Sequence, residues 1–311
     1  MTTLLGRSTL ALGTRASALA RTQSLLVADA IRAAGEVDVA LVDVATDGDR
    51  TQATDAPLEL IGGTGVFVTA LRERLLAGDI DLAVHSLKDL PTAPAAGLVV
   101  AAIPERADPR DVLVSRGGVR FVDLPPGARV GTGSPRRAAQ LLALRPDLLI
   151  APIRGNVDTR LRKVANGEYD AVVLAAAGLA RLGRSAEITE TFAIDVVLPA
   201  PGQGALAVDC RSDDPALAGL LARLDHATTR AAVIAERSLL ATLEAGCTAP
   251  VGAYAVVDKE ISLTGAVVAP DGTRMLRSIA TGSVDAAESI GCRLAEDLLA
   301  AGAADLMRTS T

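Results

Sequence analysis

Residues 128–145, Ala-Arg-Val-Gly-Thr-Gly-Ser-Pro-Arg-Arg-Ala-Ala-Gln-Leu-Leu-Ala-Leu-Arg, decide the fold of this chain. Their start predicts a short strand at 129–130, followed by a glycine turn and then by a helix. Ser134 is a typical N-cap residue, and Pro135 is favoured at the first helical position, where its missing N–H costs nothing. Pro146 then ends the helix. The stretch is therefore a strand, turn and helix unit.

The same unit occurs near the N-terminus. An apolar run at 9–12 leads through Gly-Thr-Arg-Ala-Ser (13–17) into an amphipathic stretch at 18–33, and Gly35 is a typical residue to follow a helix end. Further strands are expected at 38–44, 82–85, 99–103, 148–153, 171–174 and 206–209. Helical segments separate most of these strands. The alternation predicts an α/β fold of two duplicated lobes with mostly parallel sheets.

The pattern changes from about residue 227. A helix around 236–243 precedes three β-branched runs and a final helix, and a tight Pro-Asp-Gly turn joins the last two runs. The runs and the final helix lie at 251–257, 261–268, 275–281 and 283–301. They predict a small α+β domain with a three-stranded antiparallel sheet. We therefore expect three parts: lobe 1 at 1–104 and 202–222, lobe 2 at 105–201, and the C-terminal domain at 223–311.

Composition excludes several classes of protein. Half of the 311 residues are hydrophobic, but no apolar run approaches the ~20 residues that a membrane span needs. The first residues show no basic segment followed by an apolar core, so we expect no export signal and a cytoplasmic location. Few aromatic residues and a net charge of −6 argue against nucleic-acid binding. Two histidines and three separated cysteines suit neither a zinc site nor a disulfide framework, so we expect no metal.

Positive charge is concentrated in one window of this acidic chain. Residues 131–163 contain seven arginines and lysines against two aspartates, a net charge of +5. Several of these cations, including Arg136 and Arg137, lie just after predicted strands and at helix starts, where the helix dipole also attracts anions. The planar fork of an arginine suits carboxylate and phosphate oxygens. We therefore expect a polyanionic ligand.

A second polar cluster follows the predicted strand at 82–85. Ser86, Lys88 and Asp89 lie in a turn that ends at Pro91, at the carboxyl end of the strand, where ligands of such folds bind. Asp89 has two interpretations. It can simply form the turn, as aspartate often does, or it can stabilise positive charge on a substrate and move a proton. The residues alone leave both interpretations open.

The cysteines differ in their surroundings. Cys247 lies in a loop between a predicted helix and the first strand of the C-terminal domain, whereas Cys210 and Cys292 lie in apolar segments and are expected to be inert. Cys247 has no visible His or Asp partner, so its role as a nucleophile is open. Residues 48–65 predict a long surface loop, which we interpret as a lid.

Six runs of residues together resemble the porphobilinogen deaminase family, also called the hydroxymethylbilane synthases. In chain order they are Gly-Thr-Arg-Ala-Ser (13–17), His-Ser-Leu-Lys-Asp-Leu-Pro (85–91), Ser-Pro-Arg-Arg (134–137), Arg-Gly-Asn-Val (154–157), Pro-Gly-Gln-Gly-Ala (201–205) and Gly-Cys-Thr-Ala-Pro-Val-Gly (246–252). The resemblance spans nearly the whole chain. It implies a transferase that joins four porphobilinogen molecules head to tail, with release of ammonia, to give hydroxymethylbilane for haem biosynthesis.

The resemblance also implies site residues. A dipyrromethane cofactor would be joined to Cys247 by a thioether, and Asp89 would be the catalytic residue that stabilises a cationic azafulvene. The residues expected to hold the cofactor are Arg136, Arg137, Arg154, Arg160, Lys88 and Ser134. Those expected to hold the substrate are Arg15, Ser17, Ser86, Gln203 and Phe67. The chain departs from the family pattern at Thr64, Gly133 and Pro135, where lysine, serine and leucine are usual, so a lysine contact from the predicted lid is in doubt.

The implied partners are porphobilinogen as substrate and a uroporphyrinogen-forming synthase that takes the product, with the enzyme itself a monomer. The alternative is a two-lobed anion-binding receptor or effector domain, because the duplicated lobes also resemble periplasmic binding proteins. The absence of a visible export signal and of a DNA-binding module counts against it. A cysteine hydrolase is disfavoured because no thiol has a His or Asn in a recognisable context.

Overall fold

The computed structural model describes residues 8–35, 37–44, 65–245 and 249–307, without the side chains of 65–67. The chain divides into two compact units. The first consists of Met1–Ala107 and Ala205–Arg230, and the second of Asp108–Gly204 and Ala231–Thr311. No helix within the described ranges combines the length and the apolar character needed to cross a membrane.

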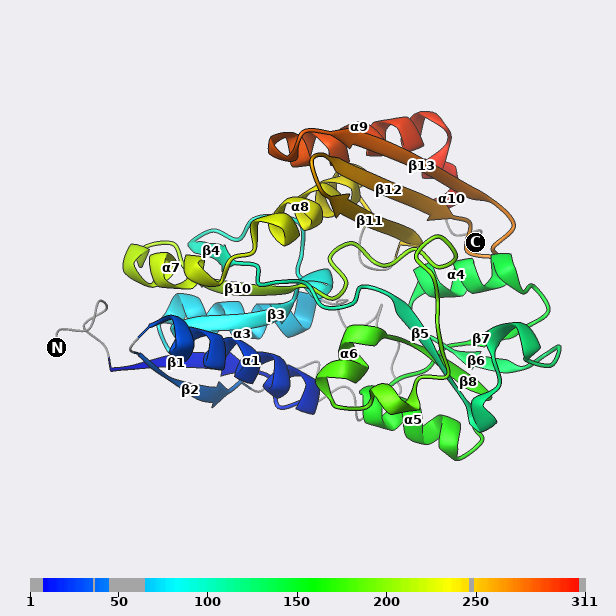
Figure 1. The fold of residues 1–311 in the computed structure, drawn as a ribbon, viewed down its shortest axis with the longest axis horizontal. Helices are drawn as coiled ribbons and strands as arrows, with labels where there is room; N and C mark the ends of the chain where they lie inside the picture. The colour runs from blue at the N-terminus through cyan, green and yellow to red at the C-terminus, as the bar shows by residue number, and fades with distance from the viewer. Residues whose placement is uncertain (1–7, 36, 45–64, 246–248, 308–311) are drawn as a thin grey trace. The chain divides into compact units, whose positions relative to one another are not determined.

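The first unit contains one five-stranded sheet, in the order β2-β1-β3-β10-β4 (Figure 1). Its strands are β1 (Thr9–Thr14), β2 (Asp38–Asp43), β3 (Leu82–Ser86), β4 (Leu98–Ala102) and β10 (Leu206–Arg211). Its helices include α1 (Ala18–Ala34), α3 (Gly65–Ala77) and α7 (Pro215–Leu221). β1 pairs in parallel with β2 and β3, whereas β10 runs antiparallel to both β3 and β4. The sheet is therefore mixed, and the expectation of mostly parallel pairing is wrong.

The second unit repeats this pattern in a sheet of order β7-β6-β8-β5-β9 (Figure 1). Its strands are β5 (Asp111–Ser115), β6 (Arg129–Gly131), β7 (Leu149–Ala151), β8 (Ala171–Ala175) and β9 (Glu190–Thr191). Its helices include α4 (Pro135–Leu144), α5 (Val157–Ala165) and α6 (Ala176–Arg181). β6 pairs in parallel with β7 and β8, and β5 runs antiparallel to β8 and β9. The identical order and direction confirm the predicted duplication.

Both sheets are mixed because each contains one strand, β10 in the first and β5 in the second, that runs antiparallel to its neighbours. β5 follows β4 along the chain but joins the sheet of the second unit, and β10 returns to the sheet of the first unit after β9. β10 is thus far in sequence from the other strands of its sheet, whereas β5 directly precedes those of its own, and each is the strand that follows a crossing from one sheet to the other. Both strands pair antiparallel with their neighbours.

Local residue choices set where the helices begin. The Ser134 hydroxyl accepts a hydrogen bond from the Arg137 N–H at 3.4 Å, and Pro135 is the first helical residue of α4. In the duplicate, Ser17 accepts from the Ala20 N–H at 3.3 Å and caps α1. Both caps satisfy a backbone donor that has no partner within its helix. They also hold the residues of each glycine turn beside the end of its strand.

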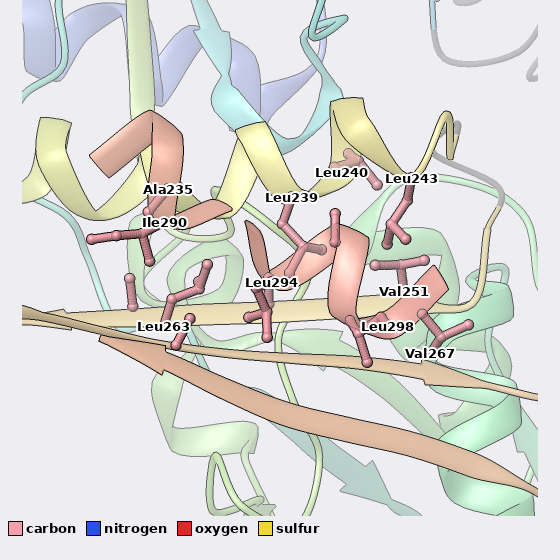
Figure 2. Packing of buried hydrophobic residues seen from close by; sticks show 14 of the residues in the cluster. Ala235, Leu239, Leu240, Leu243, Val251, Leu263, Val267, Ile290, Leu294 and Leu298 are labelled. Carbon is pink, nitrogen blue, oxygen red and sulfur yellow. The ribbon is translucent and has the colours of Figure 1, made fainter. Parts of the chain in front are cut away.

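The second unit also contains a three-stranded antiparallel sheet, which confirms the predicted C-terminal α+β element. Its strands are β11 (Val251–Val257), β12 (Ile261–Val268) and β13 (Met275–Gly282), and its helices are α8 (Ala227–Thr242), α9 (Ala287–Ala300) and α10 (Ala303–Met307). Figure 2 shows leucines of α8 and α9 meeting residues of β11 and β12. Leu239, Leu263 and Leu294 are fully buried there, and each contributes about 1.5–3 kcal/mol of burial free energy.

Candidate functional site

One group of predicted site residues lies at the carboxyl edge of the sheet in the first unit. Arg15 and Ser17 follow β1, Ser86 ends β3, and Lys88 and Asp89 belong to the single 3₁₀ turn Leu87–Asp89. β1 and β3 are parallel neighbours, with Gly13 opposite Ala83, so their carboxyl ends meet at the same edge. This is the edge at which α/β sheets bind ligands.

Backbone and side-chain hydrogen bonds hold the turn that carries Asp89. The Ser86 hydroxyl exchanges hydrogen bonds with the buried amide of Gln23 from α1, with the Gln23 Nε2 at 3.0 Å. The Leu87 N–H donates to the Ala205 carbonyl at 3.0 Å. Asp89 itself is only partly buried. The contacts with Gln23 and Ala205 thus fix the turn, while the Asp89 carboxylate remains partly exposed.

The second unit contains a buried ion cluster at the start of α4. Arg136 and Arg137 are 3% and 6% exposed, and a nitrogen of each lies 2.8 Å from the Asp111 carboxylate at the start of β5. Burial by itself would raise the pKa of Asp111, but the two guanidinium charges hold that pKa well below its usual range. Asp111 therefore remains ionised, and the three groups together carry one excess positive charge.

Carbonyl and amide groups complete this ion cluster. Arg136 donates to the Leu198 carbonyl at 2.6 Å, and Arg137 donates to the Val173 carbonyl at 3.1 Å. The Gln203 side chain is fully buried and donates its Nε2 to the Asp111 Oδ1 at 2.9 Å. These bonds fix the orientation of both guanidinium groups.

Glu236 ties the turn that carries Gln203 to the C-terminal sheet. This carboxylate of α8 is fully buried. It accepts hydrogen bonds from the Gly202 N–H at 2.7 Å and from the Ala255 N–H of β11 at 2.9 Å. The ion cluster and the three-stranded sheet therefore belong to one hydrogen-bonded network within the second unit.

Two further arginines lie beyond the carboxyl ends of β7 and β8. Arg160 donates to the Gly155 carbonyl at 2.8 Å, and Arg181 donates to the Gly204 carbonyl at 2.7 Å. Among the residues that the structure describes, neither guanidinium has a carboxylate partner. Burial lowers the pKa of Arg160 to about 10, helped by the charge of Arg137, and burial also lowers the pKa of Arg181. Both remain cations at neutral pH and favour an anion beside them.

The remaining cations of the 131–163 window differ in what they contact. Arg145 donates to the carbonyls of Phe121 and Leu124 and pairs with Asp147, so it holds the lobe together. Arg154 is partly buried between β7 and α5. The positive window predicted from the sequence therefore contains the structural cation Arg145 as well as Arg160, which has no carboxylate partner among the described residues.

Four predicted features fall on residues that are not described. Cys247 and Thr64 lie outside the described residues, as do 48–64 of the predicted lid and the side chain of Phe67, which stands at the start of α3. Of the other two thiols, Cys210 is buried in β10, and burial raises its pKa to about 11, which makes it unreactive. Within the described ranges, no group of His, Cys, Asp and Glu residues suits a metal ion.

Sequence reasoning missed two charged residues of the site. Asp111 begins β5, whose run Asp-Val-Leu-Val-Ser has only three apolar residues and does not by itself predict a strand. Arg181 ends α6, the helix that follows the buried strand β8, as Arg136 and Arg160 follow β6 and β7. Each of these arginines belongs to the helix that follows a strand of this sheet, and this shared placement is the signal that could have identified Arg181. Asp111 offers no such signal, because its partners lie 25 residues or more further along the chain.

Comparisons with known proteins agree with the resemblance of the sequence motifs. The family model described as porphobilinogen deaminase, dipyromethane cofactor binding domain, matches residues 10–219, and the model of the porphobilinogen deaminase C-terminal domain matches residues 230–300. The porphobilinogen deaminase of Thermobifida fusca (strain YX) is 56% identical over 302 residues, which cover 94% of this chain and 93% of that protein. The porphobilinogen deaminase of Acidothermus cellulolyticus is 56% identical over 313 residues, which cover 99% and 94%.

Similarity to solved structures is weaker. The periplasmic VFT2 domain of Bordetella pertussis BvgS covers 70% of this chain and 87% of its own, with 16% sequence identity and a TM-score of 0.42. Likeness at that level adds nothing to the fold described above.

Proposed function

Because this chain belongs to the porphobilinogen deaminase family, we propose that its two groups of site residues divide the work of the family's reaction. The enzyme is a transferase that joins four porphobilinogen molecules head to tail, with release of ammonia, to give hydroxymethylbilane. It builds this product on a dipyrromethane cofactor. Each pyrrole carries an acetate and a propionate, so the ligand is a chain of carboxylates.

The half-buried guanidinium groups of Arg160 and Arg181 carry this proposal. Both contact backbone carbonyls and lack a carboxylate partner among the described residues. A dipyrromethane brings four carboxylates, so the donor set of this unit fits it. We propose that Arg154, Arg160 and Arg181 contact those carboxylates, while Arg136 and Arg137 contribute the excess charge of the ion cluster. Ser134 and Gln203 support the two arginines of α4.

The cofactor supplies the free pyrrole α-carbon to which the first substrate is joined. We propose that it is held by a thioether to Cys247, on the strength of the Gly-Cys-Thr-Ala-Pro-Val-Gly motif. In the sequence, Cys247 falls between the end of α8 at Thr242 and the start of β11 at Val251.

Asp89 and its neighbours act on the substrate in this proposal. The bond between the aminomethyl carbon and nitrogen of porphobilinogen breaks, ammonia leaves, and positive charge develops on the pyrrole. The Asp89 carboxylate accepts a hydrogen bond from the pyrrole N–H and stabilises that charge. A free pyrrole α-carbon then attacks this methylene carbon to form the carbon–carbon bond, and the attacking α-carbon loses its proton, which restores neutrality. Arg15, Ser17, Ser86, Lys88 and Phe67 hold the acidic side chains and the ring.

We further propose that the enzyme is a cytoplasmic monomer that passes hydroxymethylbilane to a uroporphyrinogen-forming synthase. The two described cysteines, Cys210 and Cys292, are both free thiols, which is typical of a reducing compartment. Sedimentation at several concentrations tests the monomer, because a dimer would exceed the 31.7 kDa of one chain. The alternative of an anion-binding receptor loses its support, since the family matches cover most of the chain.

Intact mass spectrometry tests the attachment site. Purified wild type is expected to be heavier than its sequence by one dipyrromethane. Cys247→Ser is expected to lose that mass and its activity, while Cys292→Ser keeps both and serves as the matched control. An active wild-type protein with no added mass would reject the proposed thioether.

Arg181→Gln is expected to lower kcat/KM for porphobilinogen by about 10- to 100-fold, because one charge-assisted contact is worth about 1.5–3 kcal/mol. Steady-state rates of product formation measure the effect. Arg184→Gln is the matched control, since Arg184 lies three residues further along and already pairs with Asp158 and Glu187. Equal rates for the two variants would show that Arg181 does not bind the carboxylates.

A further inference from the structure

Three polar residues lie together on one face of the sheet in the first unit, next to the turn that carries Asp89. They are His85 of β3, Asp209 of β10 and Arg72 of α3, and their side chains are 4%, 0% and 15% exposed. Arg72 Nε donates to Asp209 Oδ2 at 2.9 Å, and His85 Nε2 lies 3.6 Å from the same oxygen. In the pairing of β3 with β10, Ala207 lies opposite His85 and Ala83 lies opposite Asp209, so these four side chains share one face of the sheet.

Apolar residues surround this group. Leu71, Leu75 and Ile80 form a buried cluster with Ala83 on the same face. Two atoms of the polar group, His85 Nε2 and Asp209 Oδ1, are buried and have no hydrogen-bond partner. Well-packed apolar residues of similar size would often stabilise the fold as well or better. Stability of the sheet therefore does not explain the group.

The position of His85 along the chain suggests what the group does. β3 ends one residue after His85, and Asp89 follows at the end of the 3₁₀ turn. β3 is held to β10 by backbone pairing, so any slide of β3 along β10 moves Asp89 with it. The ion pair of Arg72 and Asp209 joins α3 to β10, and the His85 ring of β3 lies beside it at the last pairs before that turn, where Ser86 lies opposite Leu206.

We propose that Arg72, Asp209 and His85 form a positioning chain that holds Asp89 where positive charge develops on the substrate. His85 is then a positioning residue, since it acts through the backbone of β3 and does not touch the substrate. This inference rests on the role proposed for Asp89. A misplacement of about 1 Å can cost a reaction about 100-fold in rate, which is why such a chain is worth keeping.

The charge state of His85 agrees with this arrangement. Burial lowers its pKa, and the positive charge of Arg72 adds to that effect, while Asp209 and Asp89 oppose it. His85 is therefore neutral at pH 7, and its ring adds no charge beside the ion pair of Arg72 and Asp209.

Substitution of His85 separates positioning from stability. In the holoenzyme, His85→Leu is expected to lower kcat by about 10- to 100-fold, with KM for porphobilinogen within about twofold and thermal stability equal or higher. His85→Gln keeps an amide near the position of Nε2 and should recover part of the rate. Val84→Ala, on the opposite face of β3, is the matched control and should lower stability but leave kcat within about twofold.

Protonation gives a second readout. The pKa of His85 is lower in the folded chain than the ordinary histidine value of 6.5, which applies in the unfolded chain. The unfolded chain therefore binds this proton more tightly, and the free energy of unfolding is undiminished above pH 6.5 and decreases as pH falls below it. His85→Gln and His85→Leu should lose this pH dependence.

The outcomes distinguish the two proposals. If Asp89→Asn is nearly inactive while His85→Leu keeps the wild-type kcat, the positioning chain is rejected and the role of Asp89 stands. If Asp89→Asn turns over normally, the role of Asp89 fails and the positioning chain fails with it. Should His85→Leu not fold, Arg72→Gln provides the same comparison, since it leaves both strands intact. An equal loss of kcat in Val84→Ala would mean that general loosening of β3 is the cause.

Discussion

Replacing Asp89 with asparagine is expected to lower kcat by about 100- to 1,000-fold, while KM for porphobilinogen and the bound cofactor stay near wild type. Asparagine keeps the shape and a hydrogen-bonding group but removes the negative charge. The charge matters most when ammonia leaves and the pyrrole becomes cationic, so the loss falls on the transition state. The backbone bond from Leu87 to Ala205 keeps the turn in place, so the variant should differ from wild type in charge alone.

Rates of ammonia release give kcat, and intact mass reports the cofactor. Asp79→Asn is the matched control, because Asp79 is an exposed carboxylate of the same unit that pairs with Arg74 at the surface. It should leave kcat unchanged. A fall of threefold or less in Asp89→Asn, which corresponds to under about 1 kcal/mol of barrier, would reject the electrostatic role of Asp89.

Asp111→Asn is expected to lower the free energy of unfolding by about 3–5 kcal/mol, the largest stability effect that we expect in this chain. The substitution leaves Arg136 and Arg137 buried side by side without a counter-charge, because Asp111 is their only carboxylate partner among the described residues. Gln203 would also lose the acceptor that it shares with Arg137. Urea unfolding of the holoenzyme, monitored by circular dichroism, measures the loss.

Acid unfolding provides a second measurement of the same carboxylate. The folded chain holds Asp111 ionised below the ordinary aspartate pKa of 3.8, whereas the unfolded chain takes up a proton there. Its contribution is therefore complete above pH 3.8 and declines as pH falls further, and Asp111→Asn should lack this decline. Asp108→Asn, three residues earlier in a surface pair with Arg110, should cost about 1 kcal/mol or less. Equal effects of the two substitutions would contradict a buried counter-ion role for Asp111.

Much of the secondary structure could be predicted because its signals are local. β11 and β12 occupy the predicted ranges 251–257 and 261–268, and α4 begins at Pro135 as its capping pattern indicates. β5 was missed because its five residues follow Asp-Pro-Arg and look like the end of a loop. The direction of β5 and β10 could not be predicted, since it depends on which sheet a strand joins and not on its own residues.

The sequence was enough to predict the kind of ligand that the site binds, but not which residues of the site contact one another. The arginine-rich window indicated an acidic ligand, but charge patterns do not show which cations are already neutralised. Arg145 and Arg160 look alike in the sequence, yet Arg145 is paired with Asp147 and Arg160 has no described carboxylate partner. That difference depends on tertiary distances, as does the pairing of Asp111 with Arg136.

The exchange of β5 and β10 between the sheets affects the order in which the protein can form during synthesis. β3 and β4 are not neighbours in their sheet, because β10 lies between them and pairs with both. A nascent chain therefore cannot close this sheet until Leu206–Arg211 has left the ribosome, long after β4 has emerged. Until the second lobe has been translated, the edges of β3 and β4 that face β10 lack their partner strand, and open edges of this kind favour aggregation.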